Sequence, residues 1–262
     1  MAASGFVSSD YLKLAAERAQ AFKQRTYAFM NIQAGDQLLD VGCGPGLDTC
    51  QLALEVGPDG KVIGVDVDAD MIAQADALAA EKGCSAVVNH LVGDVSALVF
   101  ADGAFSSVRA ERLLQVLPES YSPDAVVAEL WRVLQAGGTL VLADADWGSA
   151  SVNFSETSIE RRLMAYWASS MRPNGYAGRQ LFSLLKALGA QDLQIEIVPM
   201  MHRDLALLPF GAGLVEKAVA AKVISTEEGQ CWLKETNEMV QSGCFFASVN
   251  MVIASGRKAS RD

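Results

Sequence analysis

The chain has 262 residues, of which 51% are apolar and 20% charged, with 22 glycines and 7 prolines. This composition is typical of a globular protein and excludes collagen-like, low-complexity and wholly disordered chains. Lysine and arginine number 21 against 31 aspartates and glutamates, and the resulting net charge of −10 disfavours binding to nucleic acid, whose phosphates the protein would repel.

The sequence has no sign of a membrane span or an export signal. No stretch of 18 apolar residues is free of charged residues, and residues 1–13 lack the basic-then-apolar order of a signal peptide. Five scattered cysteines without a C-x-x-C pair, together with 2 histidines, indicate neither a disulfide framework nor a metal site. We therefore expect a soluble cytoplasmic protein that binds no metal.

Strand and helix patterns alternate along the first part of the chain. Short apolar runs rich in β-branched residues predict five strands, at 37–41, 61–65, 86–91, 105–109 and 138–143. Apolar residues spaced three and four apart predict helices at 10–30, 48–55, 70–82 and 124–134. Strands that alternate with helices in this order predict an α/β fold with a parallel sheet covered on both faces.

The rest of the chain has a mainly helical pattern. Helices are predicted at 156–171, 179–188, 207–222 and 226–241, and strands at 193–199 and 245–254. The helical insertion between the last two strands, at about 203–242, is long for a connection, so we expect it to pack over the edge of the sheet as a lid. No linker divides the chain, which predicts one domain over 1–262.

The most informative string is LLDVGCGPG at 38–46, where a strand leads directly into a G-x-G-x-G turn and then a helix. Glycines let the backbone approach a ligand closely, and a helix N-terminus offers N–H donors. Two acids end the next strands, Asp66 in VIGVDVD and Asp94 in LVGDV. With Asp40 they are expected at the carboxyl edge of the sheet, where open α/β folds bind ligands and an acid can accept bonds from a ribose.

Between residues 37 and 147 the chain resembles the class I S-adenosylmethionine-dependent methyltransferases. The resemblance rests on the DxGxGxG loop at 40–46, on Asp66 with Val67, on the pair Gly93-Asp94, and on AELWRVL at 128–134. It implies a Rossmann-like, doubly wound sheet of seven strands with the last strand antiparallel, and S-adenosylmethionine as the cofactor. The domain then divides into a helical cap (1–34), a cofactor-binding core (35–148) and an acceptor-side half (149–262).

The resemblance also implies which residues touch the cofactor. The glycine loop would line the methionine moiety, Asp66 would hold the ribose, the side chains at 67 and 71 would pack on adenine, and those at 94 and 95 would read its edge. The carbonyl of Ala110 would contact the methionine amino group. The implied cofactor-binding residues are Asp40, Gly42, Cys43, Gly44, Asp66, Val67, Met71, Gly93, Asp94, Val95 and Ala110.

Within the family, RAERLLQVLPE at 109–119 and VLADADWG at 141–148 look like the quinone and small-molecule methyltransferases of secondary metabolism. Three positions depart from the quinone pattern. Ser106 stands where an acid is usual, Ala136 where a proline is usual, and DAD at 144–146 where the quinone enzymes have an acid and a serine. A quinone substrate is therefore not supported, and a small organic acceptor is expected.

Two residues are candidates for catalysis. His202, in PMMHRD, titrates near neutral pH and is suited to take a proton from an acceptor. Asp146, together with Asp144 and Trp147, follows the predicted fifth strand at the expected carboxyl edge. A histidine at a strand end is often merely exposed. A reaction without a strong base also stays open, because carbon and amine acceptors can react without one. His90 is expected to be structural, and the pair at 111–112 fits the surface as well as the site.

The predicted function is transfer of a methyl group from the cofactor sulfonium to a nucleophilic C, O or N of a small acceptor. Two alternatives stay open: a protein of this family that binds cofactor without turnover, and a dinucleotide-dependent oxidoreductase. The oxidoreductase lacks support, because no Tyr-x-x-x-Lys spacing occurs in the chain and Asp40 and the pair Gly93-Asp94 would go unexplained.

Overall fold

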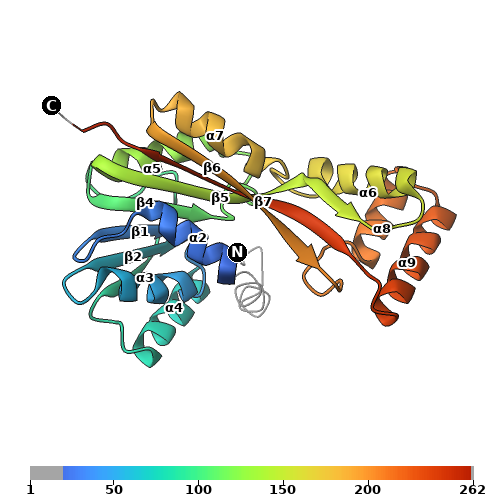
Figure 1. The fold of residues 1–262 in the computed structure, drawn as a ribbon, viewed down its shortest axis with the longest axis horizontal. Coiled ribbons are helices and arrows are strands. Elements are labelled where there is room, and N and C mark those ends of the chain that lie inside the picture. The colour runs from blue at the N-terminus through green and yellow to red at the C-terminus, as the bar shows by residue number, and fades with distance from the viewer. Residues whose placement is uncertain (1–19, 261–262) are drawn as a thin grey trace.

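Seven strands form one mixed sheet in a computed structural model that describes residues 20–260 (Figure 1). The strand order is β3-β2-β1-β4-β5-β7-β6, and β7 runs antiparallel to both of its neighbours. The strands are β1 Gln37–Val41, β2 Lys61–Asp66, β3 Val88–Val92, β4 Phe105–Glu111, β5 Leu134–Val152, β6 Gln191–His202 and β7 Ala247–Arg257. The predicted Rossmann-like sheet with an antiparallel last strand is confirmed.

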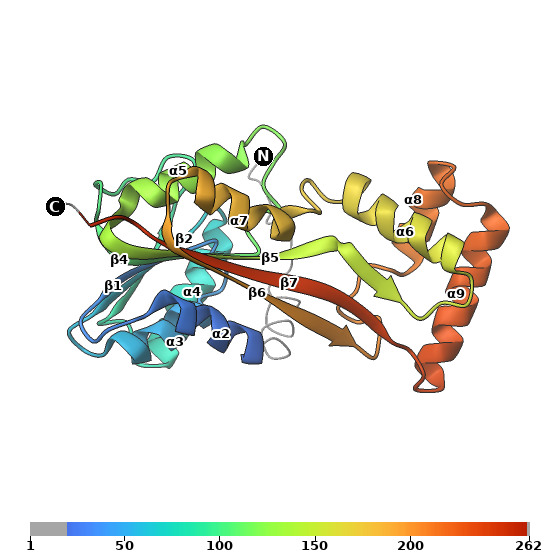
Figure 2. The same ribbon diagram turned by 45° about the horizontal axis from the view of Figure 1, so that its top comes forward.

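Helices cover both faces of this sheet. Figure 2 shows α2, α3 and α4 on one face and α5 and α7 on the other. The helices are α2 Gln20–Met30, α3 Leu47–Val56, α4 Ala69–Glu81, α5 Pro123–Val133, α6 Thr157–Ser170, α7 Ala177–Ala187, α8 Ala212–Ala220 and α9 Thr226–Gln241. Of the helix predicted at 10–30, residues 10–19 lie outside the described residues. Among residues 20–260, no helix combines the length and the apolar character that crossing a bilayer requires.

The fifth strand is far longer than predicted. The sequence indicates a strand at 138–143, whereas β5 continues to Val152 because β7 pairs with it as far as Asp146 and again at residues 151–152. The expectation that Asp144, Asp146 and Trp147 follow the strand is therefore wrong, since all three lie within it. This stretch has the polar composition of a loop, and the pairing that makes it a strand comes from residues about a hundred positions later.

The three long strands β5, β7 and β6 extend beyond the rest of the sheet towards α6, α8 and α9, where β7 begins (Figures 1 and 2). The predicted insertion at about 203–242 is present as α8 and α9, although α8 is shorter than the predicted helix. These two helices pack on each other and α8 packs on α6. The insertion thus lies past the carboxyl ends of β1 and β4, and its closure as a lid stays a prediction.

Candidate functional site

The glycine loop follows β1 and leads into α3. Gly42, Gly44 and Gly46 have φ angles of +74°, +52° and +78°, in the left-handed region that side chains other than glycine disfavour. The N–H groups of Gly42 and Cys43 donate to the carbonyl of Val65 at 2.8 and 3.1 Å, which ties the loop to the end of β2. Glycine is required at these positions by the backbone itself, as the sequence pattern predicts.

The loop rests on α4 and on His90. A Cβ atom on Gly46 would lie 2.7 Å from the Cβ of Ala75 and 3.2 Å from Nε2 of His90. The buried His90 ring contacts Thr49 Oγ1 at 2.8 Å through Nε2 and Asp76 Oδ1 at 2.9 Å through Nδ1. His90 therefore supports the loop from below, in agreement with the structural role expected for it.

Asp66 joins the loop to the second strand. Its Oδ2 accepts from the N–H of Gly44 at 2.9 Å and its Oδ1 from the N–H of Asp68 at 3.0 Å. The N–H of Gly93 in turn donates to the carbonyl of Asp66 at 2.9 Å. The structure thus brings together three of the predicted site residues, from the ends of β1, β2 and β3.

Asp94 carries local hydrogen bonds on both of its oxygens. Oδ1 accepts from the N–H and the hydroxyl of Ser96 at 2.8 and 2.7 Å, and Oδ2 accepts from the hydroxyl of Tyr121 at 2.7 Å. The bond from Tyr121, aided by those from Ser96, holds the pKa of Asp94 below its usual value. The carboxylate is exposed and ionised, and Tyr121 is a neighbour that the sequence did not indicate.

The remaining cofactor candidates differ in exposure. Val67, directly after β2, is 63% exposed, so its side chain offers an open apolar surface next to Asp66. Met71 in α4, Val95 after β3 and Ala110 in β4 are buried. Ala110 pairs with Val41 and so lies beside the start of the glycine loop. The contact of its carbonyl with the methionine amino group stays a prediction.

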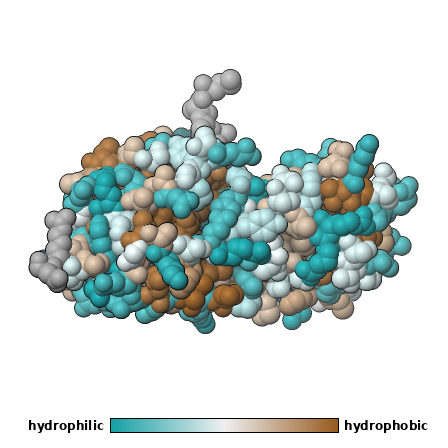
Figure 3. Space-filling model, turned by 90° about the horizontal axis from the view of Figure 1, so that it is seen from above, coloured by the Kyte–Doolittle hydropathy of each residue, from teal (hydrophilic) through white to brown (hydrophobic). Residues whose placement is uncertain are grey.

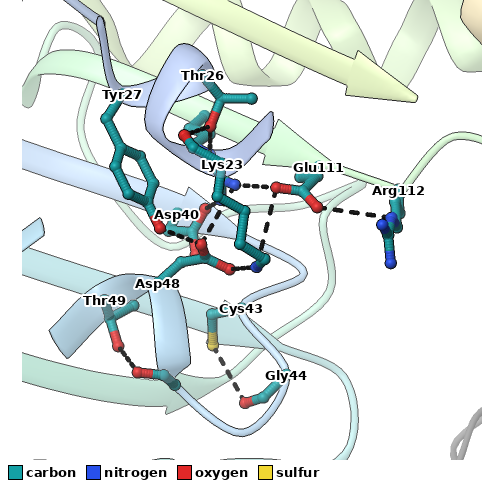
Figure 4. Close-up of polar contacts among 12 residues, drawn as sticks. Lys23, Thr26, Tyr27, Asp40, Cys43, Gly44, Asp48, Thr49, Glu111 and Arg112 are labelled. Atoms are coloured by element: carbon teal, nitrogen blue, oxygen red, sulfur yellow. Dashed lines mark hydrogen bonds and ion pairs between the residues drawn. The ribbon is translucent and has the colours of Figure 1, made fainter. Parts of the chain in front are cut away.

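Asp40 is buried behind the loop, contrary to the expectation that it lies at the open edge (Figure 4). Its carboxylate accepts from Nη1 of Arg109 at 2.7 Å, and Arg109 is itself only 1% exposed. The same guanidinium donates to Glu111, whose side chain is 6% exposed, and through Nε to Thr26 Oγ1 at 3.0 Å. Glu111 is therefore part of a buried network and not of a surface pair.

Helix α2 contributes further side chains to this network. Lys23 and Tyr27 both bind the carboxylate of Asp48, which lies in the first turn of α3 (Figure 4). Burial raises the pKa of Asp48, but the attraction of Arg109 and Lys23 outweighs it and holds that pKa below its usual value. Burial also raises the pKa of Tyr27 and of the Cys43 thiol, so both stay neutral.

The network has equal numbers of opposite charges. Its cations, Lys23, Arg109 and the part-exposed Arg112, face three acids, Asp40, Asp48 and Glu111. Burial raises the pKa of Asp40, and the charge of Asp48 adds to the shift, although Arg109 opposes it. Arg109 could have been suspected from sequence, since a charge between Val108 and Ala110 in a central strand requires a partner.

The two catalytic candidates are not brought together. Asp146 is held by Arg179, whose Nε and Nη2 both lie 2.9 Å from Oδ1. Strand β7 lies between β5 and β6. Asp146 of β5 pairs with Asn250 of β7, and His202, the last residue of β6, pairs with Ala247 of β7. His202 therefore lies two strands across and three residues further out, a separation of roughly 10 Å in each direction.

Asp144 is the most deeply buried acid near the site. It is 1% exposed and accepts from the N–H groups of Ala145 at 2.9 Å and Gln115 at 3.2 Å. Burial raises the pKa of Asp144 to about 7, although these backbone bonds oppose the shift. A folded-state pKa above the unfolded value means that the folded protein holds the proton more tightly, so stability is lost as pH rises towards and through 7.

Replacing Asp144 by asparagine is expected to flatten this pH dependence. Between pH 5 and 8 the free energy of unfolding of the native protein should fall by about 2–3 kcal/mol more than that of Asp144→Asn, because asparagine has no proton to lose. Urea unfolding at a series of pH values measures both curves. Asp146→Asn, at an acid paired with Arg179, is the control. Parallel curves for the native protein and Asp144→Asn would refute the assignment.

Comparisons with known proteins agree with this geometry. The family described as "Methyltransferase domain" matches residues 32–197. A 37.1 kDa protein of a Streptomyces fradiae transposon is 30% identical over 240 residues, covering 90% of this chain and 67% of that protein. A demethylmenaquinone methyltransferase of Lactococcus lactis is 34% identical over 139 residues, 52% of this chain and 54% of that enzyme, so the match spans about half of its length.

Solved structures agree on the fold. A geranyl diphosphate C-methyltransferase from Streptomyces coelicolor, solved with S-adenosyl-L-homocysteine, superposes with a TM-score of 0.57 over 98% of this chain and 86% of that one, at 18% identity. At this identity the likeness shows the fold alone. The family match over 32–197, the loop at 40–46 and the strand order together establish that the chain belongs to the class I S-adenosylmethionine-dependent methyltransferases.

Proposed function

We propose that this protein moves the methyl group of S-adenosylmethionine to a nucleophilic carbon, oxygen or nitrogen of a small organic acceptor. The observation that carries the proposal is the left-handed glycine loop, which is bonded to Asp66 and backed by a buried network of ion pairs. That arrangement suits a cofactor that packs against the loop backbone and presents the hydroxyls of a ribose to an acid.

The residues present fit this cofactor. We assign its methionine part to the backbone of Gly42, Cys43 and Gly44, its ribose to Asp66, and its adenine to the segment around Asp94. When bound, the cofactor supplies an electrophilic methyl group. The chain has to hold the acceptor in line with that group and to exclude water, which together lower the barrier by several kcal/mol. We assign the exclusion of water to the insertion at about 203–242 and place the reaction in the cytoplasm.

Proton removal constrains the choice of acceptor. Asp146 is bound by Arg179, Glu111 by Arg109, and His202 lies two strands away from Asp146. His202 and Asp146 stay as candidate catalytic residues, but neither is placed to act as a strong base on its own. We therefore favour an acceptor whose nucleophilic atom is an amine or an activated carbon, which reacts without a strong base.

Two measurements test the proposal. Calorimetry should detect binding of S-adenosylhomocysteine, and labelled S-adenosylmethionine should transfer its methyl group to at least one member of a panel of small acceptors. Binding of S-adenosylhomocysteine without methyl transfer to any acceptor of the panel would favour the alternative of a protein that holds cofactor without turnover. Binding of a nicotinamide dinucleotide in place of the homocysteine compound would favour the oxidoreductase alternative.

Replacing Asp66 by alanine is expected to weaken binding of S-adenosylhomocysteine by about 1–3 kcal/mol, the scale for losing a good hydrogen-bonding partner. The substitution removes the expected ribose acceptor and also the bond to the N–H of Gly44. Calorimetry measures the change. Asp59→Ala, at an exposed acid before β2 and at the opposite end of that strand, is the matched control. Unchanged affinity in Asp66→Ala would remove this residue from the site.

A further inference from the structure

Two cysteine thiols meet on the face of the sheet that α3 and α4 cover. Cys50 lies in the first turn of α3, and Cys84 follows the end of α4. Their Sγ atoms are 3.4 Å apart, so the two sulfurs are in direct contact. Both side chains are half-buried, and both thiols are free. The sequence does not indicate this contact, because 34 positions separate the two cysteines.

The surroundings of the pair leave the two sulfurs to each other. Sγ of Cys84 also lies 3.6 Å from the carbonyl of Ala79, which is a weak contact for an S–H donor. Within residues 20–260, no three histidine, cysteine or acidic side chains are grouped as metal ligands. A single buried thiol usually acts as a small hydrophobic side chain, as Cys43 does at 6% exposure. Two half-buried thiols in contact can in addition react with each other.

The geometry of the pair suits a disulfide. A disulfide holds its sulfurs about 2 Å apart, so the two atoms have to approach by a little over about 1 Å. Rotation about the Cα–Cβ bonds of the two side chains supplies a movement of this size. The backbone on one side is already anchored, because the N–H of Cys84 donates to the carbonyl of Ala79 at 2.9 Å. The bond can therefore form without rearrangement of the helices.

The pair lies behind the glycine loop. The N–H of Cys50 donates to the carbonyl of Gly46 at 3.2 Å, and Gly46 is seated against Ala75 of α4. A bond between Cys50 and Cys84 would therefore join the two helices that hold the loop. It would also close the segment between them, which contains β2 and most of α4. Closing a loop of this length removes entropy from the unfolded chain and stabilises the folded one.

We propose that Cys50 and Cys84 are a redox modification site, which reacts with a small disulfide of the glutathione class and becomes an internal disulfide. Disulfides inside cells are usually transient and redox-sensing, and two free thiols in contact suit that use. The cross-link ties α3 to the end of α4, so the oxidised protein resists unfolding better than the reduced one. The site does not depend on which acceptor the protein methylates.

The exchange takes two steps. The Cys84 thiol loses its proton and attacks one sulfur of the oxidant, whose S–S bond breaks, so that a mixed disulfide forms and one small thiolate leaves. The Cys50 thiol then loses its proton and attacks the sulfur of Cys84, which forms the internal bond and releases the second small thiolate. The protein gives up two protons and two electrons, and the oxidant is reduced to two thiols. Burial raises the pKa of Cys50 to about 12, which makes Cys84 the first to react.

Intact-mass spectrometry tests the proposal in the full chain with the two exposed cysteines replaced, Cys231→Ser and Cys244→Ser. Cys231 lies in α9 and Cys244 follows it, at the end of the molecule beyond the point where it narrows (Figures 1 and 3), and both would otherwise collect glutathione. Three of the five cysteines remain. Glutathione disulfide should lower the mass by two hydrogens and the number of thiols from three to one, and dithiothreitol should restore both. An unchanged mass, or attached glutathione without an internal bond, would overturn the proposal.

Single variants in the same chain locate the bond. Cys50→Ser or Cys84→Ser should abolish the loss of two hydrogens, whereas Cys43→Ser, at a buried thiol outside the pair, should retain it. Loss of two hydrogens in Cys50→Ser or in Cys84→Ser would overturn the assignment. The mass of the parent chain decides if a variant does not fold.

Urea unfolding tests the stabilising role of the bond. The oxidised chain should have a urea midpoint about 1 M above that of the reduced chain, as expected for closing a loop of this length. The Cys84→Ser variant, treated with glutathione disulfide in the same way, should show no such rise. Equal midpoints of the oxidised and reduced chains would overturn the stabilising role.

Discussion

Replacing Arg109 by methionine is expected to lower the free energy of unfolding by about 3–5 kcal/mol, the scale for removing one member of a buried ion pair. Arg109 is 1% exposed and its guanidinium is shared by Asp40, Asp48 and Glu111. Without it, the three acids would face only Lys23 and the part-exposed Arg112. Uptake of a proton by Asp40, whose pKa is already raised, recovers part of the loss but not the hydrogen bonds.

A second substitution separates charge from packing. In Arg109→Met combined with Asp40→Asn, the cations Lys23 and Arg112 face the two acids Asp48 and Glu111, so opposite charges are again equal in number. We expect this double variant to regain at least about 1 kcal/mol relative to Arg109→Met, a coupling typical of contacting pairs. Urea unfolding at pH 7 measures all variants. Arg179→Met is the control, because the half-exposed Arg179 pairs with Asp146 and its loss should cost at most about 1 kcal/mol. Equal losses at positions 109 and 179 would contradict the prediction.

The sequence predicts the glycine loop and the acids after it because their requirements are local. A left-handed turn needs glycine at 42, 44 and 46 whatever the rest of the chain does. Asp66 and Asp94 end or follow strands whose apolar runs are visible in the sequence, and the alternation of strands and helices fixes the edge at which those strands end. The fold class and the place of the cofactor loop therefore follow from short-range patterns.

The features that the sequence did not predict all depend on distant partners. The length of β5 is set by β7, which pairs with Asp146 through Asn250. Asp40 is buried because Arg109, 69 residues later, binds it, and Lys23 reaches Asp48 from a helix that shows no charge pattern of its own. The ring of Trp147 in β5 packs against that of Trp167 in α6, and no spacing in the sequence indicates that contact.

The glycine loop allows the sharpest test of the site. Replacing Gly46 by alanine is expected to weaken binding of S-adenosylhomocysteine by at least about tenfold and to lower the free energy of unfolding by roughly 2–4 kcal/mol. The new Cβ would lie 2.7 Å from Cβ and 2.9 Å from Cα of Ala75, and a Cα atom in the middle of α4 cannot move aside without shifting that helix. The loop has to move instead, which displaces the backbone that we assign to the cofactor.

Gly35→Ala is the matched control for this prediction. Gly35 has a φ of +85°, close to the +78° of Gly46, but a Cβ atom there would have nothing within 4 Å. The Gly35→Ala variant therefore adds only backbone strain, about 1 kcal/mol, and should bind S-adenosylhomocysteine as the native protein does. Calorimetry and urea unfolding of the two variants separate strain from collision. If Gly46→Ala retained native affinity, the loop would tolerate displacement, and its assignment as the cradle of the cofactor would be wrong.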